Sequence, residues 1–277
     1  MSAAGATESF RTSLADTADV AALRDTFVVP RYLAPAGEML LDLLAINESA
    51  QIAHLGCRTG FPDAEILARL AGATLYGCDP SASAVQLAQS KASAGGLSAE
   101  YLVAESTSTP FPRGAFTHGV ALDVAPDARA AVLAELERLL VPGGQLLVTT
   151  LLRGSAQELT CLLREYAVAY DRAELSRGLD RWTTTRPTPE MLAREIEALG
   201  FDYIEVEHQR IRLRFQSGRD FLDDPVCKLV LFPEAERNLR TPLAAPLEYV
   251  RKAIDRYWAT AALELPLSIG CVSARKR

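Results

Sequence analysis

The chain has 277 residues, a formal net charge of −6 at pH 7 and a hydrophobic content of 49%, with a pI near 5.3. This length is sufficient to bury a large core, either in one domain with insertions or in two domains. The acidic balance and the lack of a basic stripe argue against nucleic acid as the main partner, because phosphate contacts need clustered lysines and arginines.

Cysteine and histidine usage gives no sign of a metal site. Five cysteines are scattered without a CxxC pair, which favours reduced thiols in a cytoplasmic protein. The three histidines show none of the spacings typical of metal ligands, so no metal is expected. Neither a secretory leader nor an apolar stretch of the about 20 residues needed to cross a bilayer is recognisable. The sequence therefore predicts a cytoplasmic protein that does not enter a membrane.

The first half of the chain alternates between strand and helix patterns. Residues 1–20 are rich in small residues and are expected to be flexible, and a helix is predicted at 35–46. Strands are then predicted at 51–55, 73–79, 99–105, 115–123 and 145–150, with helices at 62–72, 81–96 and 126–140. This alternation indicates parallel strands joined by crossover helices that cover both faces of a sheet.

The pattern changes after residue 150. Helices are predicted at 155–175, within 182–200 and at 246–262, and strands at 201–215 and 265–276. The apolar alternation of 201–215 changes phase near His208–Arg210, which predicts a bulge or a bend. The simplest organisation is one domain over 21–277 with insertions near 151–187 and 216–262.

Two segments of the alternating part suggest a ligand site. HLGCRTG, residues 54–60, follows an apolar strand and opens a helix. Its glycines Gly56 and Gly60 would let a ligand approach the backbone, and the following helix start offers N–H groups to an anion. Asp79 ends the second strand, where a carboxylate can accept both hydroxyls of a ribose.

These segments, in this order, resemble the class I S-adenosylmethionine (SAM)-dependent methyltransferases of small molecules, of the methyltransferase 11 type, over roughly residues 35–215. LYGCDPSASAVQLAQ resembles the segment with the ribose-binding acid, and LVAESTSTPFP resembles the segment whose acid faces the adenine amino group. ELERLLVPGGQLLVTT resembles the helix, Pro-Gly-Gly turn and fifth strand typical of the group. The resemblance places at the cofactor the residues His54, Gly56, Cys57, Arg58, Gly60, Asp79, Pro80, Glu105 and Ser106.

The resemblance implies an α/β fold with a Rossmann-like, doubly wound, mostly parallel seven-stranded sheet, an antiparallel last strand and helical insertions. It implies SAM as the cofactor, no metal, and a small-molecule acceptor that the sequence does not identify. The acceptor pocket is expected from the N-terminal segment and the insertions, with Tyr32, Tyr166, Tyr170 and Trp182 as candidate lining residues. An oligomer or a protein partner stays open.

The first motif departs from the family pattern at two positions. His54 stands where the motif begins with an acid, and a neutral imidazole carries no charge to balance the ammonium or the sulfonium of SAM. Arg58 stands where the middle glycine is expected, and a left-handed backbone there would cost roughly 1–2 kcal/mol more than with glycine. Its guanidinium either turns to solvent and leaves the site usable, or enters the pocket, repels the sulfonium and favours an anionic ligand.

Three functional hypotheses follow. The first is a SAM-dependent methyltransferase, for which no catalytic triad is needed because the cofactor supplies the reactivity. His118 and His208 are candidates for a general base, with a structural role favoured for both. The second is a non-catalytic protein with a binding, regulatory or scaffolding role that has weakened or lost SAM binding through Arg58 and His54. The third is a nucleotide-binding oxidoreductase, disfavoured because GxGxxG is absent.

Overall fold

The computed structural model describes residues 16–277, and these divide into two compact units. The first, called the sheet unit below, comprises residues 16–151, 187–209 and 269–277. The second, called the insertion unit, comprises residues 152–186 and 210–268. The sequence predicts a flexible segment over residues 1–20. Residues 1–15 of this segment lie outside the described residues, and a helix begins at Ala18.

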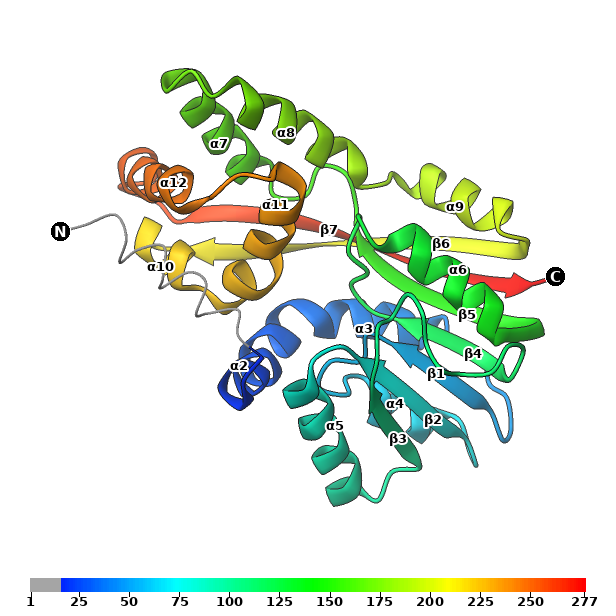
Figure 1. Cartoon of the computed structure of the whole chain (residues 1–277). Helices are drawn as coiled ribbons and strands as arrows, with labels where there is room; N and C mark the ends of the chain where they lie inside the picture. Colours follow the sequence, from blue (N-terminus) through cyan, green and yellow to red (C-terminus); the bar gives the residue numbers. More distant parts are fainter. Residues whose placement is uncertain (1–15) are drawn as a thin grey trace. The chain divides into compact units, whose positions relative to one another are not determined.

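A seven-stranded sheet has the order β3-β2-β1-β4-β5-β7-β6 (Figure 1). Its strands are β1 Gln51–Leu55, β2 Thr74–Asp79, β3 Ala99–Val103, β4 Phe116–Ala121, β5 Leu140–Leu151, β6 Phe201–Phe215 and β7 Leu263–Lys276. The pairs from β3 through β5 are parallel, whereas β7 runs antiparallel to β5. The predicted Rossmann-like sheet with an antiparallel last strand is thereby confirmed.

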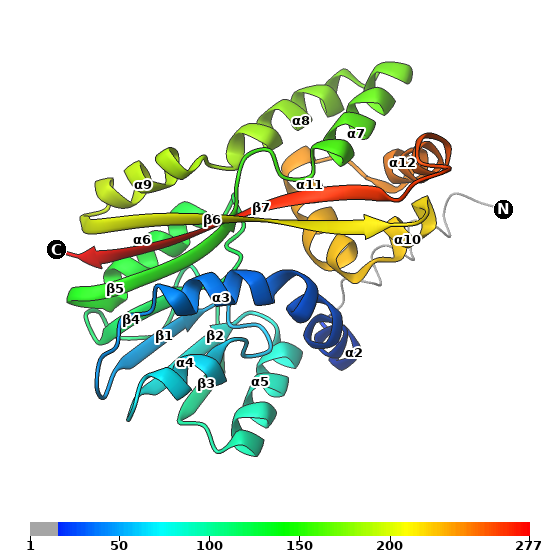
Figure 2. The same cartoon turned by 180° about the vertical axis from the view of Figure 1, so that it is seen from behind.

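Helices cover both faces of the sheet in the sheet unit. They are α2 Ala18–Leu23, the π-helix η1 Arg24–Leu33, α3 Ala34–Asp42, α4 Asp63–Arg69, α5 Ala82–Gly95, α6 Arg129–Leu139 and α9 Pro189–Ala198. Helix α6 contacts β1, β4 and β5, and α3 lies on the opposite face, in front in the reverse view (Figure 2). This two-sided cover explains why nearly all residues of β1 and β4 are buried.

Local sequence signals set the ends of several helices. Helix α5 begins after Ser81, whose side chain accepts from the Ala84 amide, and it ends at Gly96 with φ +61°. Helix α9 begins after Thr188, which accepts from the Met191 amide. Hydroxyl caps and a left-handed glycine terminate helices because they satisfy the free backbone groups at each end. These boundaries agree with the predicted ones.

Other elements differ from the sequence-based expectation. The residues around the Pro-Gly-Gly turn belong to β5, which begins at Leu140 rather than at 145. β6 is one strand through His208–Arg210, so the bulge or bend predicted there does not divide it. Residues 182–185 belong to α8, which ends because Arg186 leaves the helical conformation with ψ 130° ahead of Pro187, and the helix predicted after Thr188 is α9. A residue before proline is driven toward extended geometry.

The loop between β3 and β4 is held to α6 by a buried carboxylate. Glu135 Oε1 accepts from the Thr109 amide at 2.8 Å and from Thr109 Oγ1 at 2.6 Å. Arg138 donates to the same oxygen at 2.7 Å and to the Phe111 carbonyl at 2.9 Å. The hydrogen bond from Arg138 lowers the pKa of Glu135 from 4.5 to about 2, assisted by the bonds from Thr109. This contact fixes the loop that carries Glu105.

The insertion unit contains six helices among its described residues: α7 Gln157–Ala169, α8 Ala173–Thr185, α10 Gly218–Asp223, the π-helix η2 Cys227–Leu231, α11 Phe232–Leu239 and α12 Ala244–Tyr257. The sequence predicts helices in the regions of α7 and α12, and it indicates the rest of this unit only as insertions. Short helices such as α10 and η2 give too few turns for a clear periodic pattern.

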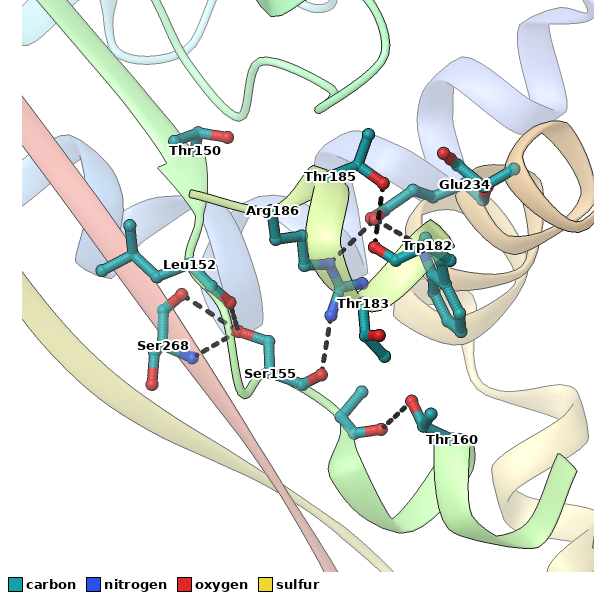
Figure 3. A network of polar contacts seen from close by, with 12 residues as sticks. Thr150, Leu152, Ser155, Thr160, Trp182, Thr183, Thr185, Arg186, Glu234 and Ser268 are labelled. Carbon is teal, nitrogen blue, oxygen red and sulfur yellow. Dashed lines mark hydrogen bonds and ion pairs between the residues drawn. The ribbon is translucent and has the colours of Figure 1, made fainter. Parts of the chain in front are cut away.

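A buried polar network joins four parts of the insertion unit (Figure 3). Arg186, which is 4% exposed, donates through Nε to Glu234 Oε1 at 2.9 Å and through Nη1 to the Ser155 carbonyl at 2.7 Å. The Trp182 indole N–H donates to the same Glu234 oxygen at 2.8 Å. Ser155 Oγ accepts from the Ser268 amide at 2.9 Å, which brings in the start of β7. The network therefore ties the end of α8 to α11 and to the turn before α7.

Removing the charge of Glu234 should destabilise the protein strongly. In Glu234→Gln the buried Arg186 guanidinium keeps its charge without a counterion, and loss of one partner of a buried pair costs about 3–5 kcal/mol. The matched control Asp180→Asn breaks the exposed Arg164–Asp180 pair of the same unit, for which less than about 1 kcal/mol is expected. Urea unfolding followed by circular dichroism measures both, and equal losses would contradict the assignment of a buried ion pair.

The contribution of Glu135 to stability should depend on pH. Because folding lowers the pKa of this carboxyl, its stabilisation is present above about pH 4.5 and is lost as the pH falls toward 2. Wild type should exceed Glu135→Gln by on the order of 2–3 kcal/mol at pH 7, and the difference should shrink between pH 4.5 and 2.5. Urea unfolding at several pH values tests this, with exposed Glu65→Gln as the control. A gap that stays constant down to pH 2.5 would disprove the proposed coupling.

Candidate functional site

A cavity of about 240 Å³ lies in the sheet unit at the carboxyl ends of the central strands. It is lined by Leu55, Gly56, Arg58, Asp79, Pro80, Glu105, Ser106, Thr107, Leu122, Asp123, Val124, Ala125, Ala128 and Val132. The strand order reverses between β1 and β4, and ligands of open α/β sheets bind at such a reversal, outside the carboxyl ends of the strands. The cavity is slightly smaller than the roughly 300–1,000 Å³ typical of ligand pockets.

The turn after β1 has a left-handed backbone at three positions, one of which is Gly60 with φ +77°. Gly56 has φ +66° and Arg58 has φ +49°. Glycine adopts this conformation without steric cost, whereas arginine is strained there. The Arg58 amide donates to Asp79 Oδ2 at 3.0 Å. The turn thereby reaches the end of β2 through its backbone, despite the missing middle glycine.

The side chain of Arg58 is bound to the loop after β4. Nη1 donates to the Leu122 carbonyl at 2.8 Å, and Nη2 donates to the Asp123 carbonyl at 3.1 Å and to Asp123 Oδ2 at 3.0 Å. Of the two orientations expected for this guanidinium, the structure shows the one that enters the pocket lining. Its charge is nevertheless paired with a carboxylate, so the repulsion of a cationic ligand is smaller than for an unpaired arginine.

Asp79 stands at the end of β2 with its carboxylate oriented by the backbone. Oδ1 accepts from the Ser81 amide at 2.9 Å, and Oδ2 accepts from the Arg58 amide at 3.0 Å. Each carboxylate oxygen can accept a further hydrogen bond. Glu105 and Ser106 line the neighbouring part of the cavity, and Glu105 is exposed. The cavity thus offers two acidic side chains to a ligand from the ends of β2 and β3.

Helix η1 is attached to the loops that follow β1 and β4. Tyr32 is 2% exposed, and its hydroxyl donates to Asp123 Oδ1 at 2.5 Å. Thr59 Oγ1 donates to Asp25 Oδ1 at 2.7 Å, and Lys91 forms an ion pair with the same oxygen at 2.7 Å. Asp123 therefore accepts hydrogen bonds from two elements, from the Tyr32 hydroxyl on η1 and from the Arg58 guanidinium in the turn after β1.

Sequence reasoning missed Asp123 and the acidic residue of η1. Asp123 has φ +47°, a conformation in which Asp and Asn are enriched among non-glycine residues. The available signal was a carboxylate directly after a predicted parallel strand, at the same sheet edge as Asp79. For Asp25 no sequence signal was available, because the residue makes its contacts from a helix without a recognisable pattern.

His54 lies in the buried interior rather than at the cavity. It is 0% exposed, and its Nδ1 lies 2.6 Å from Asp63 Oδ1. The Tyr101 hydroxyl donates to Asp63 Oδ2 at 2.7 Å, and burial together with this carboxylate raises the pKa of Tyr101. The imidazole thus pairs with the first residue of α4. Among the described residues, His54, Cys57 and Gly60 are not part of the cavity lining.

Two buried thiols flank the turn. Cys57 and Cys78 are 1% and 0% exposed. Burial raises the pKa of Cys78 to about 12 and that of Cys57 well above its ordinary value. Both thiols are therefore protonated at neutral pH, and neither is an activated nucleophile.

The two candidate bases occupy different environments. His118 is 1% exposed, its Nε2 donates to the Ala45 carbonyl at 3.0 Å, and burial lowers its pKa. This contact gives His118 a structural role. His208 is an exposed residue of β6. Neither residue is part of the described cavity lining.

Three of the candidate acceptor residues belong to the insertion unit. Tyr166 and Tyr170 pack together with ring centroids 4.7 Å apart, and Tyr166 lines a separate cavity of about 480 Å³ in that unit. Trp182 is 1% exposed and donates to Glu234. Tyr32 is engaged with Asp123 in the sheet unit. Their predicted contact with an acceptor stays a prediction.

Residues 16–277 contain no group of three or more His, Cys, Asp or Glu side chains placed to hold a metal ion. Within the same range, no helix has the length and apolar character required to cross a membrane.

Comparison with known proteins relates this cavity to one family. A family model described as a methyltransferase domain matches residues 52–144. The demethylmenaquinone methyltransferase of Thermus thermophilus is 34% identical over 113 residues, which represent 39% of this chain and 50% of that protein. The match thus spans about half the length of this curated relative. The matched segment contains all the residues that line the cavity, including Asp79 and Glu105.

Solved structures share the fold at low identity. The cyclase SpnF is 20% identical with a TM-score of 0.52, over 87% of this chain and 80% of that chain. Phosphoethanolamine N-methyltransferase 2 of Haemonchus contortus, solved with S-adenosyl-L-methionine, is 17% identical with a TM-score of 0.52, over 88% of this chain and 52% of that chain. The matched segment, the curated relative and the sheet order together relate residues 52–144 of this chain to methyltransferase domains.

Proposed function

We propose that this protein is a methyltransferase that binds SAM in the sheet-unit cavity and transfers its methyl group to a small molecule. The observation that carries the proposal is the position of Asp79. Its carboxylate ends β2, lines the cavity and is held beside the left-handed turn after β1 by the Arg58 amide. That arrangement suits the two hydroxyls of a ribose.

The nucleoside part of SAM fits the residues present. Asp79 can accept the ribose hydroxyls, and Glu105 and Ser106 supply polar atoms beside it for the base. The apolar side chains of Leu122, Val124 and Val132 complete this part of the lining and can cover a flat ring. A small number of placed polar groups within an apolar lining is typical of cofactor sites.

The amino-acid tail of SAM must share the cavity with Arg58. The guanidinium is bound to the loop after β4 through three hydrogen bonds. Because the ion pair with Asp123 neutralises it, the side chain does not add a net positive charge to the lining. The proposal is therefore compatible with the charge of Arg58.

When bound, SAM supplies the electrophilic methyl group, and the residues of this chain have to align the acceptor and exclude water. The buried Tyr32 hydroxyl and the Asp123 carboxylate are already hydrogen-bonded to each other at 2.5 Å. They hold η1 against the strand ends and thereby restrict access of solvent from that side. A small-molecule acceptor is also what the name of the curated relative indicates for that protein.

Binding of SAM should depend on Asp79. In wild type, SAM at a hundred times its Kd should raise Tm by roughly 5–10 °C. In Asp79→Asn the charge is lost while the size is kept, and Kd should rise about 10- to 100-fold, because a hydrogen bond to a charged group is worth about 1.5–3 kcal/mol. Isothermal titration calorimetry measures Kd.

The control for this experiment is Glu100→Gln, an exposed carboxylate on β3 outside the cavity lining. Its Kd should equal that of wild type. Absence of SAM and S-adenosylhomocysteine binding to wild type would refute the proposed function, and an unchanged Kd in Asp79→Asn would refute the placement of the ribose.

A second candidate function is favoured by the position of Arg58. A guanidinium fixed across the turn reduces the room for an amino-acid tail, as expected for a member of the fold that binds SAM weakly or not at all. The similarity to the cyclase SpnF, although it shows the fold alone, is consistent with a non-methylating role for this architecture. A binding or regulatory protein is therefore the alternative.

Replacing Arg58 with glycine should separate the two candidates. Arg58→Gly removes the left-handed strain and the positive charge that neutralises Asp123, so the Asp123 carboxylate is left unpaired near the tail. For a SAM-binding enzyme, the affinity for SAM should rise about 3- to 10-fold relative to that for S-adenosylhomocysteine, because only SAM carries the sulfonium charge. Calorimetric titration of both ligands measures this ratio, and Arg58→Lys, which retains the charge, is the control.

The outcomes assign the function as follows. Binding to wild type supports the enzyme, whereas binding that is seen only in Arg58→Gly supports the non-catalytic alternative. The test does not replace His54 with the acid of the family pattern, because that acid would lie beside the Asp63 carboxylate in the buried interior. A third outcome is an equal ratio of SAM affinity to S-adenosylhomocysteine affinity in wild type, Arg58→Gly and Arg58→Lys. That result would show that Arg58 does not act on the ligand charge.

A further inference from the structure

The outer edge of β6 is open in the described part of the chain. β6 is the last strand of the sheet and has β7 as its neighbour on one side (Figure 1). Within residues 16–277, no strand lies on its other side. Unpaired N–H and C=O groups along a strand edge are a template for pairing with another extended chain. The second half of β6, residues 210–215 of the insertion unit, is therefore a candidate docking edge.

Three arginines project from one face of this half of β6. Because side chains alternate along a strand, Arg210, Arg212 and Arg214 share a face at intervals of roughly 6.8 Å, and they are called the arginine row below. All three residues are exposed. Leu213 and Phe215 lie on the opposite face and are buried. The arginine row thus arises from the register of the strand, since apolar residues separate its members in the sequence.

The arginine row carries more positive charge than its neighbours neutralise. Among residues 16–277, Glu264 of β7 is the only carboxylate paired with it, with Oε1 3.3 Å from Arg214 Nε and Oε2 3.9 Å from Arg212 Nε. Within the same range, the side chain of Arg210 forms no hydrogen bond and no ion pair. Three guanidinium groups against one carboxylate leave a local excess of positive charge in a chain whose net charge is −6.

The uniform sign of the arginine row argues against a second copy of this chain at the edge. If two copies paired antiparallel around a two-fold axis at Arg212, the two Arg212 side chains would lie opposite each other, and Arg210 would lie opposite the partner's Arg214. An axis at Ile211 or at Leu213 also places arginines opposite each other. Like charges directly opposite destabilise a strand pair. The edge is therefore protected against self-association and open to a strand of opposite charge.

We propose that the outer edge of β6 binds an acidic, extended segment of another protein, which adds to the sheet as an antiparallel strand. Directly opposite residues of such a pair have Cβ atoms about 4.5–5.5 Å apart on the same face. Acidic side chains at alternate positions of the segment then each face one member of the arginine row. Backbone hydrogen bonds supply affinity, and the arginine row selects alternating Asp or Glu. The proposal does not depend on what the cavity of the sheet unit binds.

The test uses a fluorescent peptide of about nine residues in which glutamate and valine alternate. Fluorescence anisotropy with the full chain measures its Kd. Arg210→Gln should raise Kd about 2- to 5-fold, because one opposite-charge pair across two strands is lost. Replacing the whole arginine row with glutamine should raise Kd about 10- to 100-fold.

The matched control is Arg219→Gln, which removes an arginine of α10 in the same unit with a side chain that is 86% exposed. Its Kd should equal that of wild type. All the replaced side chains are exposed, so the Tm of every variant should stay within about 2 °C of wild type. A change in Kd at an unchanged Tm then reports the loss of docking rather than a loss of folding.

Two further peptides separate strand addition from charge attraction. One has the same glutamates and valines in two separate runs, and the other is the alternating peptide with methyl groups on alternate backbone amides. Both keep the total charge, but the first lacks the spacing of the arginine row and the second lacks backbone donors. Each should bind at least about tenfold more weakly. The alternating peptide alone should slow hydrogen exchange at outward-facing amides of residues 210–215.

Equal affinity for the alternating and the methylated peptides would show attraction without strand addition and would overturn the proposal. An absence of binding to wild type would also overturn it, as would an unchanged Kd after replacement of the whole arginine row. Tighter binding of a single-stranded oligonucleotide of equal charge would assign the edge to nucleic acid instead. A wild-type dimer that the peptide dissociates would assign the edge to a second copy of this chain.

Discussion

The ion pair between Arg58 and Asp123 is the interaction on which the geometry of the candidate site depends. It joins the turn after β1 to the loop after β4, the two strands between which the strand order reverses. The backbone amide of Arg58 extends this connection to Asp79, and the hydroxyl of Tyr32 extends it to η1. Four segments that are distant in sequence therefore meet around one guanidinium and one carboxylate. A side chain that departs from the family pattern has become the centre of the polar contacts at the cavity.

Much of the fold followed from hydrophobic periodicity. The β1–β5 alternation was recognisable because each strand is apolar and each helix amphipathic, and the edge that binds ligands follows from parallel strand direction. Asp79 was found in this way, since it is the acid at the end of the second predicted strand, whereas Glu105 was implied by the resemblance to the methyltransferase family. The positions of Gly56 and Gly60 in the turn were equally clear from the sequence.

The contacts of long side chains could not be predicted in the same way. The sequence left two orientations open for Arg58, because nothing in a local pattern shows which acceptors a flexible guanidinium will reach. His54 was expected as a cofactor contact because of its place in the motif. It is paired with Asp63 instead, because a buried imidazole needs a hydrogen-bond partner and its Nδ1 lies 2.6 Å from Asp63 Oδ1 at the start of α4.

The buried thiols beside the turn have a practical consequence. Cys57 and Cys78 are enclosed, whereas Cys161 is exposed on α7. A sulfhydryl reagent should therefore modify Cys161 at once, and it should reach Cys57 and Cys78 only when the β1 turn separates from the end of β2. The alkylation of Cys57 and Cys78, followed separately from that of the buried Cys227 and Cys271, would then time the opening of this region. Its retardation by an occupant of the crevice would report occupancy without an enzymatic assay.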